Sequence, residues 1–166
     1  MKIILSASKI NQTAPYKVTI QSDSSLEFQT DNGCVFQIGF TEDFMISETG
    51  VYQFYIHNKT NTPSLNDTKL KETIFAVFEN FFEYKSRVAI YICDSMDGKQ
   101  HIRNRLFQIW FDSYSKKDNY TLKTVSIYFE GTPYYSALLI HKDNEDHDTY
   151  LQLYQQFIQQ WTDKYQ

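Results

Sequence analysis

The first third of the chain alternates between apolar and polar positions with a period of two, the pattern of half-buried strands. The alternation runs over residues 16–21, 26–30, 34–40 and 51–57, whereas residues 1–14 carry no regular pattern. The turn Asp31-Asn32-Gly33 indicates a hairpin, because Asn and Gly tolerate the positive φ of tight turns. Short links between strands favour antiparallel neighbours, so we predict a four-strand meander.

A helical period replaces this alternation from Lys69 onward, and Asn66 or Asp67 can cap the helix. The predicted core-facing positions are Leu70, Ile74, Val77, Phe78 and Phe81. Phe75 and Phe82 fall on the opposite side, so we expect this helix to be covered on both sides or to lie partly at an interface.

The second half of the chain begins with an apolar run at residues 87–92, which predicts a central strand. A polar turn at residues 93–98 follows it and leads into a helix from Lys99. The predicted core stripe of this helix is Ile102, Leu106, Ile109, Trp110 and Tyr114. A hairpin follows, with strands at residues 122–129 and 134–141. The last helix carries a stripe of Tyr150, Tyr154, Phe157 and Trp161, with Leu151 and Ile158 beside it.

The resulting order is four strands, helix, strand, helix, two strands, helix. This order predicts an α+β fold with a largely antiparallel sheet and helices packed against it. We expect one domain over residues 1–166, since domains of about 100–150 residues are the commonest.

The composition is aromatic and mildly acidic, with 13 Tyr, 13 Phe, 2 Trp and a net charge of −4. Aromatic richness suits a core, a protein-binding surface or a base-stacking surface. The segment Lys99–Lys123 nevertheless carries six bases and two acids, a local charge of +4 that leaves −8 on the remainder. A basic helix on an acidic body suits an acidic partner, or is simply a solvated face. The acidic remainder argues against nucleic-acid binding.

Cysteine usage and hydropathy favour a cytoplasmic protein. Cys34 and Cys93 are far apart and neither has metal-type spacing, so we expect two free thiols in a reducing compartment. The N-terminal apolar run is shorter than a signal-peptide core, and no run approaches the roughly 18 apolar residues of a spanning helix. We expect no membrane association and no cofactor.

The densest group of chemically active residues lies between Asp94 and Arg105, where the central strand passes into a helix. Backbone N–H groups at a helix start can hold an anion. The candidate ligand-binding residues are Asp94, Asp97, Gly98, Lys99, His101, Arg103 and Arg105. In the alternative interpretation, an Asp caps the helix, the glycine permits the turn and the bases are solvated. The sequence contains no GxGxxG or GxxxxGK[ST] motif to support phosphate binding.

Metal binding and nucleophilic catalysis are two further possibilities in the same region, but each lacks part of the set of residues that it needs. Asp94, Asp97 and His101 are possible metal ligands, and Asp97 and His101 are four residues apart and could share a helix face. No further ligand is evident nearby, so we predict no metal site. Cys93 near a helix start is a possible nucleophile, although free cysteines are more often buried and inert. Its conceivable bases are His57, His101, His141 and His147. We assign no catalytic residue.

The run Ile92-Cys93-Asp94-Ser95-Met96-Asp97-Gly98-Lys99-Gln100, followed by Arg103, Arg105, Phe107 and Trp110-Phe111, resembles a small family of uncharacterised bacterial proteins. This resemblance implies a bacterial protein of unknown function and gives no mechanism. The later half is also similar in element order to acetyltransferases of the GNAT type. Between Ile56 and Leu70, however, there is no glycine-containing pyrophosphate loop, which argues against acyl-CoA binding.

These observations favour a non-catalytic binding or regulatory module that recognises a protein partner or self-associates as a homodimer. The alternative is a small enzyme or ligand-binding protein, of an anion, nucleotide or acyl-transfer type, that uses the segment from Asp94 to Arg105.

Overall fold

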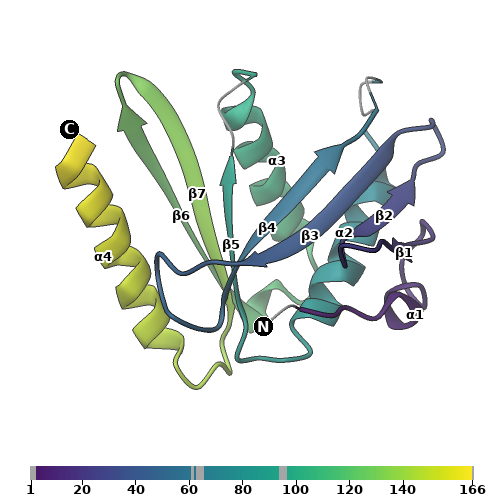
Figure 1. Ribbon diagram of the computed structural model, residues 1–166, viewed down its shortest axis with the longest axis horizontal. Helices are drawn as coiled ribbons and strands as arrows, with labels where there is room; N and C mark the ends of the chain where they lie inside the picture. The colour runs from purple at the N-terminus through teal and green to yellow at the C-terminus, as the bar shows by residue number, and fades with distance from the viewer. Residues whose placement is uncertain (1–2, 61, 63–65, 94–96, 166) are drawn as a thin grey trace. The chain divides into compact units, whose positions relative to one another are not determined.

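The computed structural model describes residues 3–60, 62, 66–93 and 97–165. Its strands follow the order β1-β2-β3-β4-β5-β7-β6 in a sheet (Figure 1). The strands are β1 (Thr19–Ile20), β2 (Leu26–Gln29), β3 (Val35–Glu42), β4 (Val51–Asn58), β5 (Val88–Cys93), β6 (Tyr120–Phe129) and β7 (Thr132–His141). The helices are α1 (Ala7–Ile10), α2 (Thr68–Phe81), α3 (Gln100–Ser113), the 3-10 turn η1 (Lys117–Asn119) and α4 (His147–Tyr165). The predicted α+β class and N-terminal meander are confirmed.

The chain divides into two compact units. The N-terminal unit comprises Met1–Thr41 and Phe54–Tyr84, and the C-terminal unit comprises Glu42–Gln53 and Lys85–Gln166.

The core of the N-terminal unit is built on α2 and is strongly aromatic. The side chain of Asp67 caps this helix, accepting hydrogen bonds from the N–H of Lys69 at 2.9 Å and of Leu70 at 3.3 Å, as predicted. Stacked, tilted and edge-on ring contacts join Phe40, Phe54, Phe78, Phe81 and Phe82. The prediction that Phe82 lies on the side of the helix opposite Phe78 and Phe81 is wrong, because its ring contacts both of them. The helix ends at Phe81, and Phe82 turns into the core as its C-cap residue.

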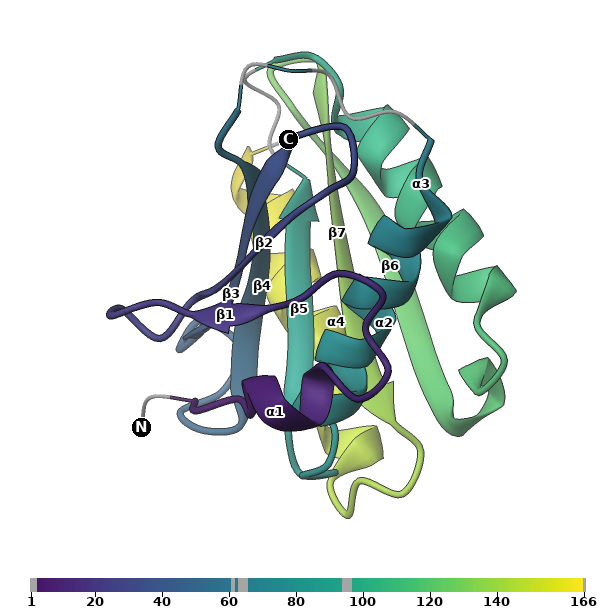
Figure 2. The same cartoon turned by 90° about the vertical axis from the view of Figure 1, so that its right-hand side faces the viewer.

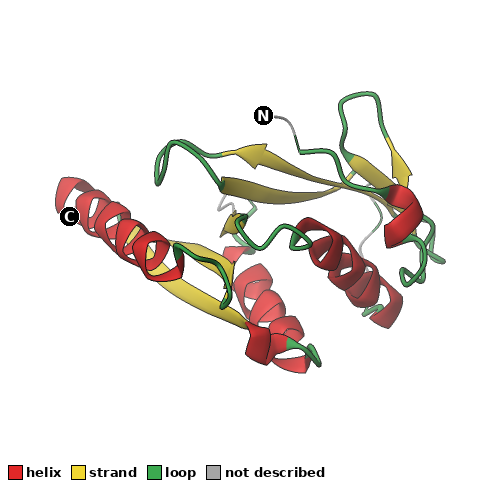
Figure 3. Ribbon diagram, turned by 90° about the horizontal axis from the view of Figure 1, so that it is seen from below, coloured by secondary structure: helices red, strands yellow, loops and turns green. Residues whose placement is uncertain are grey.

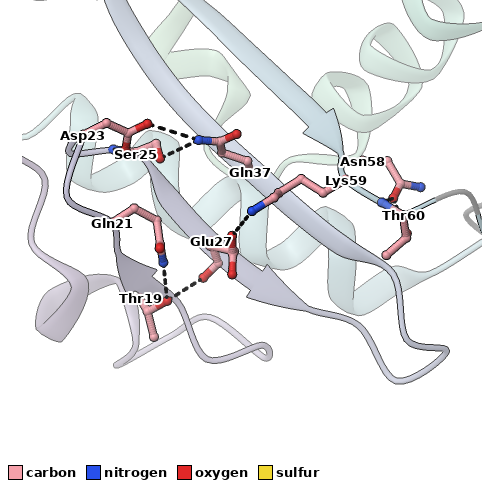
Figure 4. A network of polar contacts seen from close by, with 9 residues as sticks. All are labelled: Thr19, Gln21, Asp23, Ser25, Glu27, Gln37, Asn58, Lys59 and Thr60. Carbon is pink, nitrogen blue, oxygen red and sulfur yellow. Dashed lines mark hydrogen bonds and ion pairs between the residues drawn. The ribbon is translucent and has the colours of Figure 1, made fainter.

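A polar network lies on the N-terminal unit (Figure 4). The Gln37 amide donates to Ser25 Oγ at 2.8 Å and to Asp23 Oδ2 at 3.3 Å, so it links β3 to the turn before β2. The Lys59 ammonium lies 2.7 Å from the Glu27 carboxylate. The first contacts join β3 to the turn before β2, and the ion pair joins the residue after β4 to β2, on the far side of β3.

In the C-terminal unit, β5 runs parallel to β4 and antiparallel to β7. Because successive side chains of a strand point to opposite sides, β5 contributes to both faces of the sheet. The helices α4 and α3 lie on opposite faces of this part of the sheet (Figures 2 and 3). One face packs against α4 through a cluster that contains Val51, Val88, Ile90, Leu138, Ile140, Tyr150 and Tyr154. The Tyr91 ring on the other face lies 4.8 Å from the Phe107 ring of α3. The β5 strand is therefore central, as predicted.

The predicted core stripe of α3 is wrong at Ile102, Leu106 and Ile109. Their side chains are 55%, 40% and 52% exposed, and they form one row that we call the outer face of α3. The opposite, inner face carries Gln100 and Phe107. The Gln100 amide donates to the carbonyl oxygen of Pro133 on β7 at 3.1 Å. Because Gln100 and Phe107 hold the inner face against the sheet, the aliphatic row on the opposite side of α3 points away from it.

The hydroxyl of Tyr154 provides a test of the C-terminal core. It donates to Ser136 Oγ at 3.0 Å, and both side chains are buried. We expect Tyr154→Phe to destabilise the protein by about 1–3 kcal/mol, because the buried serine loses its partner. Denaturant titration of this variant would measure the loss, and Tyr128→Phe, at a 57% exposed phenol, should leave the stability unchanged. Equal stabilities would contradict this account.

The same phenol makes stability depend on alkaline pH. Burial raises the pKa of Tyr154 to about 12, so the folded state favours the neutral phenol. This contribution is fully present below the ordinary tyrosine pKa of about 10 and is lost as the pH rises through the folded value. The alkaline fall in stability should therefore be smaller in Tyr154→Phe.

Candidate functional site

The turn before α3 is organised by one ion pair between Asp97 and Arg103. The guanidinium donates two hydrogen bonds to the carboxylate, at 2.8 and 2.9 Å, and the N–H of Lys99 donates a third at 3.0 Å. The Arg103 guanidinium, followed by the Lys99 N–H, holds the pKa of Asp97 well below its ordinary value. Asp97 and Arg103 are therefore engaged with each other, and neither offers its full charge to a ligand.

The remaining predicted ligand-binding residues occupy different places around this pair. Asp94 lies outside the described residues. Gly98 has a φ of +69°, which a side chain would disfavour, so its role in the turn is conformational. Lys99 is the N-cap residue of α3 but makes no side-chain capping bond.

The exposed side chains of His101 and Arg105 are four residues apart, on one flank of α3. Arg103 lies on the other flank, because two residues correspond to about 200° around a helix. The structure thus brings Asp97, the Lys99 backbone and Arg103 together, whereas helix geometry directs Arg103 and Arg105 to different sides. Within the described part of the chain, no three His, Cys, Asp or Glu side chains group as metal ligands.

Cys93 ends β5 and is poorly suited to nucleophilic chemistry. Its side chain is 3% exposed, and burial raises the pKa of its thiol to about 11, a shift that the nearby Arg103 only partly offsets. The thiolate is the reactive form of cysteine. Cys93 therefore remains almost entirely protonated at neutral pH and behaves as a small core residue.

A hydrogen-bonded chain of three side chains joins β6 to the start of α4, and the sequence pattern did not reveal it. Thr121 Oγ1 lies 2.9 Å from His147 Nε2, and His147 Nδ1 lies 2.8 Å from Asp148 Oδ1. A hydroxyl, an imidazole and a carboxylate follow in the order of a hydrolase triad. The Asp148 side chain is, however, 93% exposed, whereas the acid of a triad is buried and fixed. We interpret the chain as a clamp that holds α4 to β6.

The outer face of α3 presents apolar surface, unlike the turn before α3 and the hydrogen-bonded chain that begins at Thr121. Ile102, Leu106 and Ile109 follow the spacing i, i+4, i+7, which aligns them in one row along the helix. Lys99 and Arg105 lie beside the row near its N-terminal end, and Asp112 lies near its C-terminal end. An apolar row rimmed by charged residues is typical of a surface that binds another protein.

The ion pair at the turn predicts a specific acid titration. In Arg103→Gln, the pKa of Asp97 should rise toward the ordinary value of about 3.9, which NMR of the side-chain carboxyl carbons would measure. Because the folded pKa is depressed, the pair stabilises the protein above the ordinary Asp value, and this contribution is lost as the pH falls through the folded value. The destabilisation caused by Arg103→Gln should therefore fade in acid.

Arg105→Gln is the matched control, because it removes a base from the other flank of the same helix. It should leave the titration of Asp97 unchanged. If Asp97 titrated alike in the wild type and in Arg103→Gln, the assigned ion pair would be wrong.

Comparison with known proteins places the chain in a family. No curated protein matches the sequence. No helix in the described ranges has the length and apolar character needed to cross a membrane. A family model described as a family of unknown function (DUF6169) matches residues 66–156. The match includes α2, β5, α3 and the β6–β7 hairpin, and therefore both faces of α3. It covers more than half of the chain, which thus belongs to DUF6169, a family of unknown function.

Proposed function

We propose that this protein is a non-catalytic binding module and that it binds a protein partner through the outer face of α3. The exposed row of Ile102, Leu106 and Ile109 carries the proposal. Helices that dock into an apolar groove, or against a second helix, use anchors at i, i+3 or i+4, and i+7. The row has this spacing, and it lies on a helix whose other face is held to the sheet.

The chemistry of the polar groups supports a binding role over a catalytic one. Asp97 and Arg103 neutralise each other, and the Cys93 thiol is buried. The Thr121 hydroxyl lies beside the His147 imidazole, but the carboxylate of Asp148 next to that imidazole is exposed to solvent. None of these groups combines an activated nucleophile with an oriented base, which covalent catalysis requires.

Site-specific photo-crosslinking in the source cells tests this proposal. A photo-reactive residue in place of Gln108, on the flank of α3 that carries His101 and Arg105, should form protein adducts, whereas the same residue in place of the exposed Gln160 on α4 should not. Leu106→Lys should reduce the adduct yield at position 108 at least about fivefold, because central apolar anchors contribute more than about 1 kcal/mol to binding. Gln155→Lys adds the same charge at another exposed site and should have no effect.

Two results would contradict the proposal. One is an equal adduct yield at positions 108 and 160, or a yield that Leu106→Lys leaves unchanged. The other is hydrolysis of a chromogenic ester by the wild type that Thr121→Val abolishes, since this would make the chain of Thr121, His147 and Asp148 a catalytic site.

A further inference from the structure

The charges around the outer face of α3 limit which partner it fits. In the first two turns the helix carries His101, Arg103 and Arg105, directly after Lys99 at the N-cap. Asp112 lies in the last turn, and no acid precedes it within α3. Arg103 is paired with Asp97, which leaves Lys99 and Arg105 as the cationic rim nearest the apolar row. The N-terminal half of the outer face is therefore apolar and basic.

A second copy of this chain fits such a face poorly. In an antiparallel two-fold pair centred near Leu106, Arg105 of one protomer lies close to Arg105 of the partner subunit. In a parallel pair, Arg105 of one protomer meets the flank that carries Lys99 of the partner subunit. Both arrangements set bases against bases, which costs binding free energy. Self-association through this face is therefore disfavoured.

An anionic lipid surface or a nucleic acid is also a poor partner for the outer face of α3, because of the charge on the rest of the chain. The segment Lys99–Lys123 carries a charge of +4, but the rest of the chain carries −8. A phosphate-rich surface extends well beyond one helix of 14 residues and would repel the acidic remainder. A small acidic partner that contacts α3 alone avoids this repulsion.

We infer that the occupant of the outer face is an acidic amphipathic helix of another protein, an inference that rests on the proposed binding function. Its apolar residues pack between Ile102, Leu106 and Ile109, and its carboxylates face Lys99 and Arg105. A helix of 14 residues spans about 21 Å, so the contact is smaller than the roughly 800 Å² per partner of a standard interface.

Charge reversal at Arg105 tests this partner chemistry in the full-length protein. With the photo-reactive residue in place of Gln108, Arg105→Glu should lower the adduct yield about 5- to 10-fold, because an attraction at the rim becomes a repulsion. Arg105→Lys keeps the charge and should retain the yield. In purified mixtures, added salt should weaken the wild-type complex, since exposed ion pairs are screened.

Mass spectrometry of the adducts distinguishes failure of this inference from failure of the proposed function. The expected crosslinked peptide comes from a different protein, is net acidic and has apolar residues at helical spacing. Adducts that need Leu106 but join two copies of this chain, or that contain a basic peptide, would overturn the inference and leave the binding function intact. Insensitivity to Arg105→Glu would also overturn it. If the adduct yield did not change in Leu106→Lys, both the inference about the partner and the proposed binding function would be wrong.

Discussion

The way in which α3 lies on the sheet depends on the contact between Tyr91 of β5 and Phe107 of the helix. Their rings are 4.8 Å apart, and two turns of helix further toward the N-terminus the Gln100 amide reaches the Pro133 carbonyl. An aromatic pair of this kind buries large area and prefers a defined geometry. Because this face is held down, the aliphatic face must point outward. The exposed row is a direct consequence of the buried pair.

In the proposed function, electrostatics gives the outer face its selectivity. The ion pair of Asp97 and Arg103 uses one base to fasten the turn before the helix, and Arg105 remains on the opposite flank. Apolar side chains supply the area for association, whereas the rim charges discriminate between partners. The remainder of the chain carries a net charge of −8, so in the proposed complex the net basic segment is Lys99–Lys123.

Local patterns were sufficient to predict most of the architecture. Alternation located the strands of the meander, Asn32-Gly33 located its hairpin, and Asp67 capped α2 as its side-chain chemistry required. The inner face of α3 could not be predicted in this way, because the helix is apolar on two sides and periodicity alone does not rank them. The contact of Thr121 with His147 was also hidden, since 26 residues separate two side chains that only the folded hairpin and α4 bring together.

Solvent accessibility of the methyl groups on α3 tests the central claim most directly. A soluble paramagnetic probe should broaden the NMR signals of the Ile102, Leu106 and Ile109 methyl groups in the free protein. It should spare those of Leu138 and Ile140, which are buried under α4. Protection of the three α3 residues to the same degree as these core residues would contradict the account, because the outer face would then already be covered.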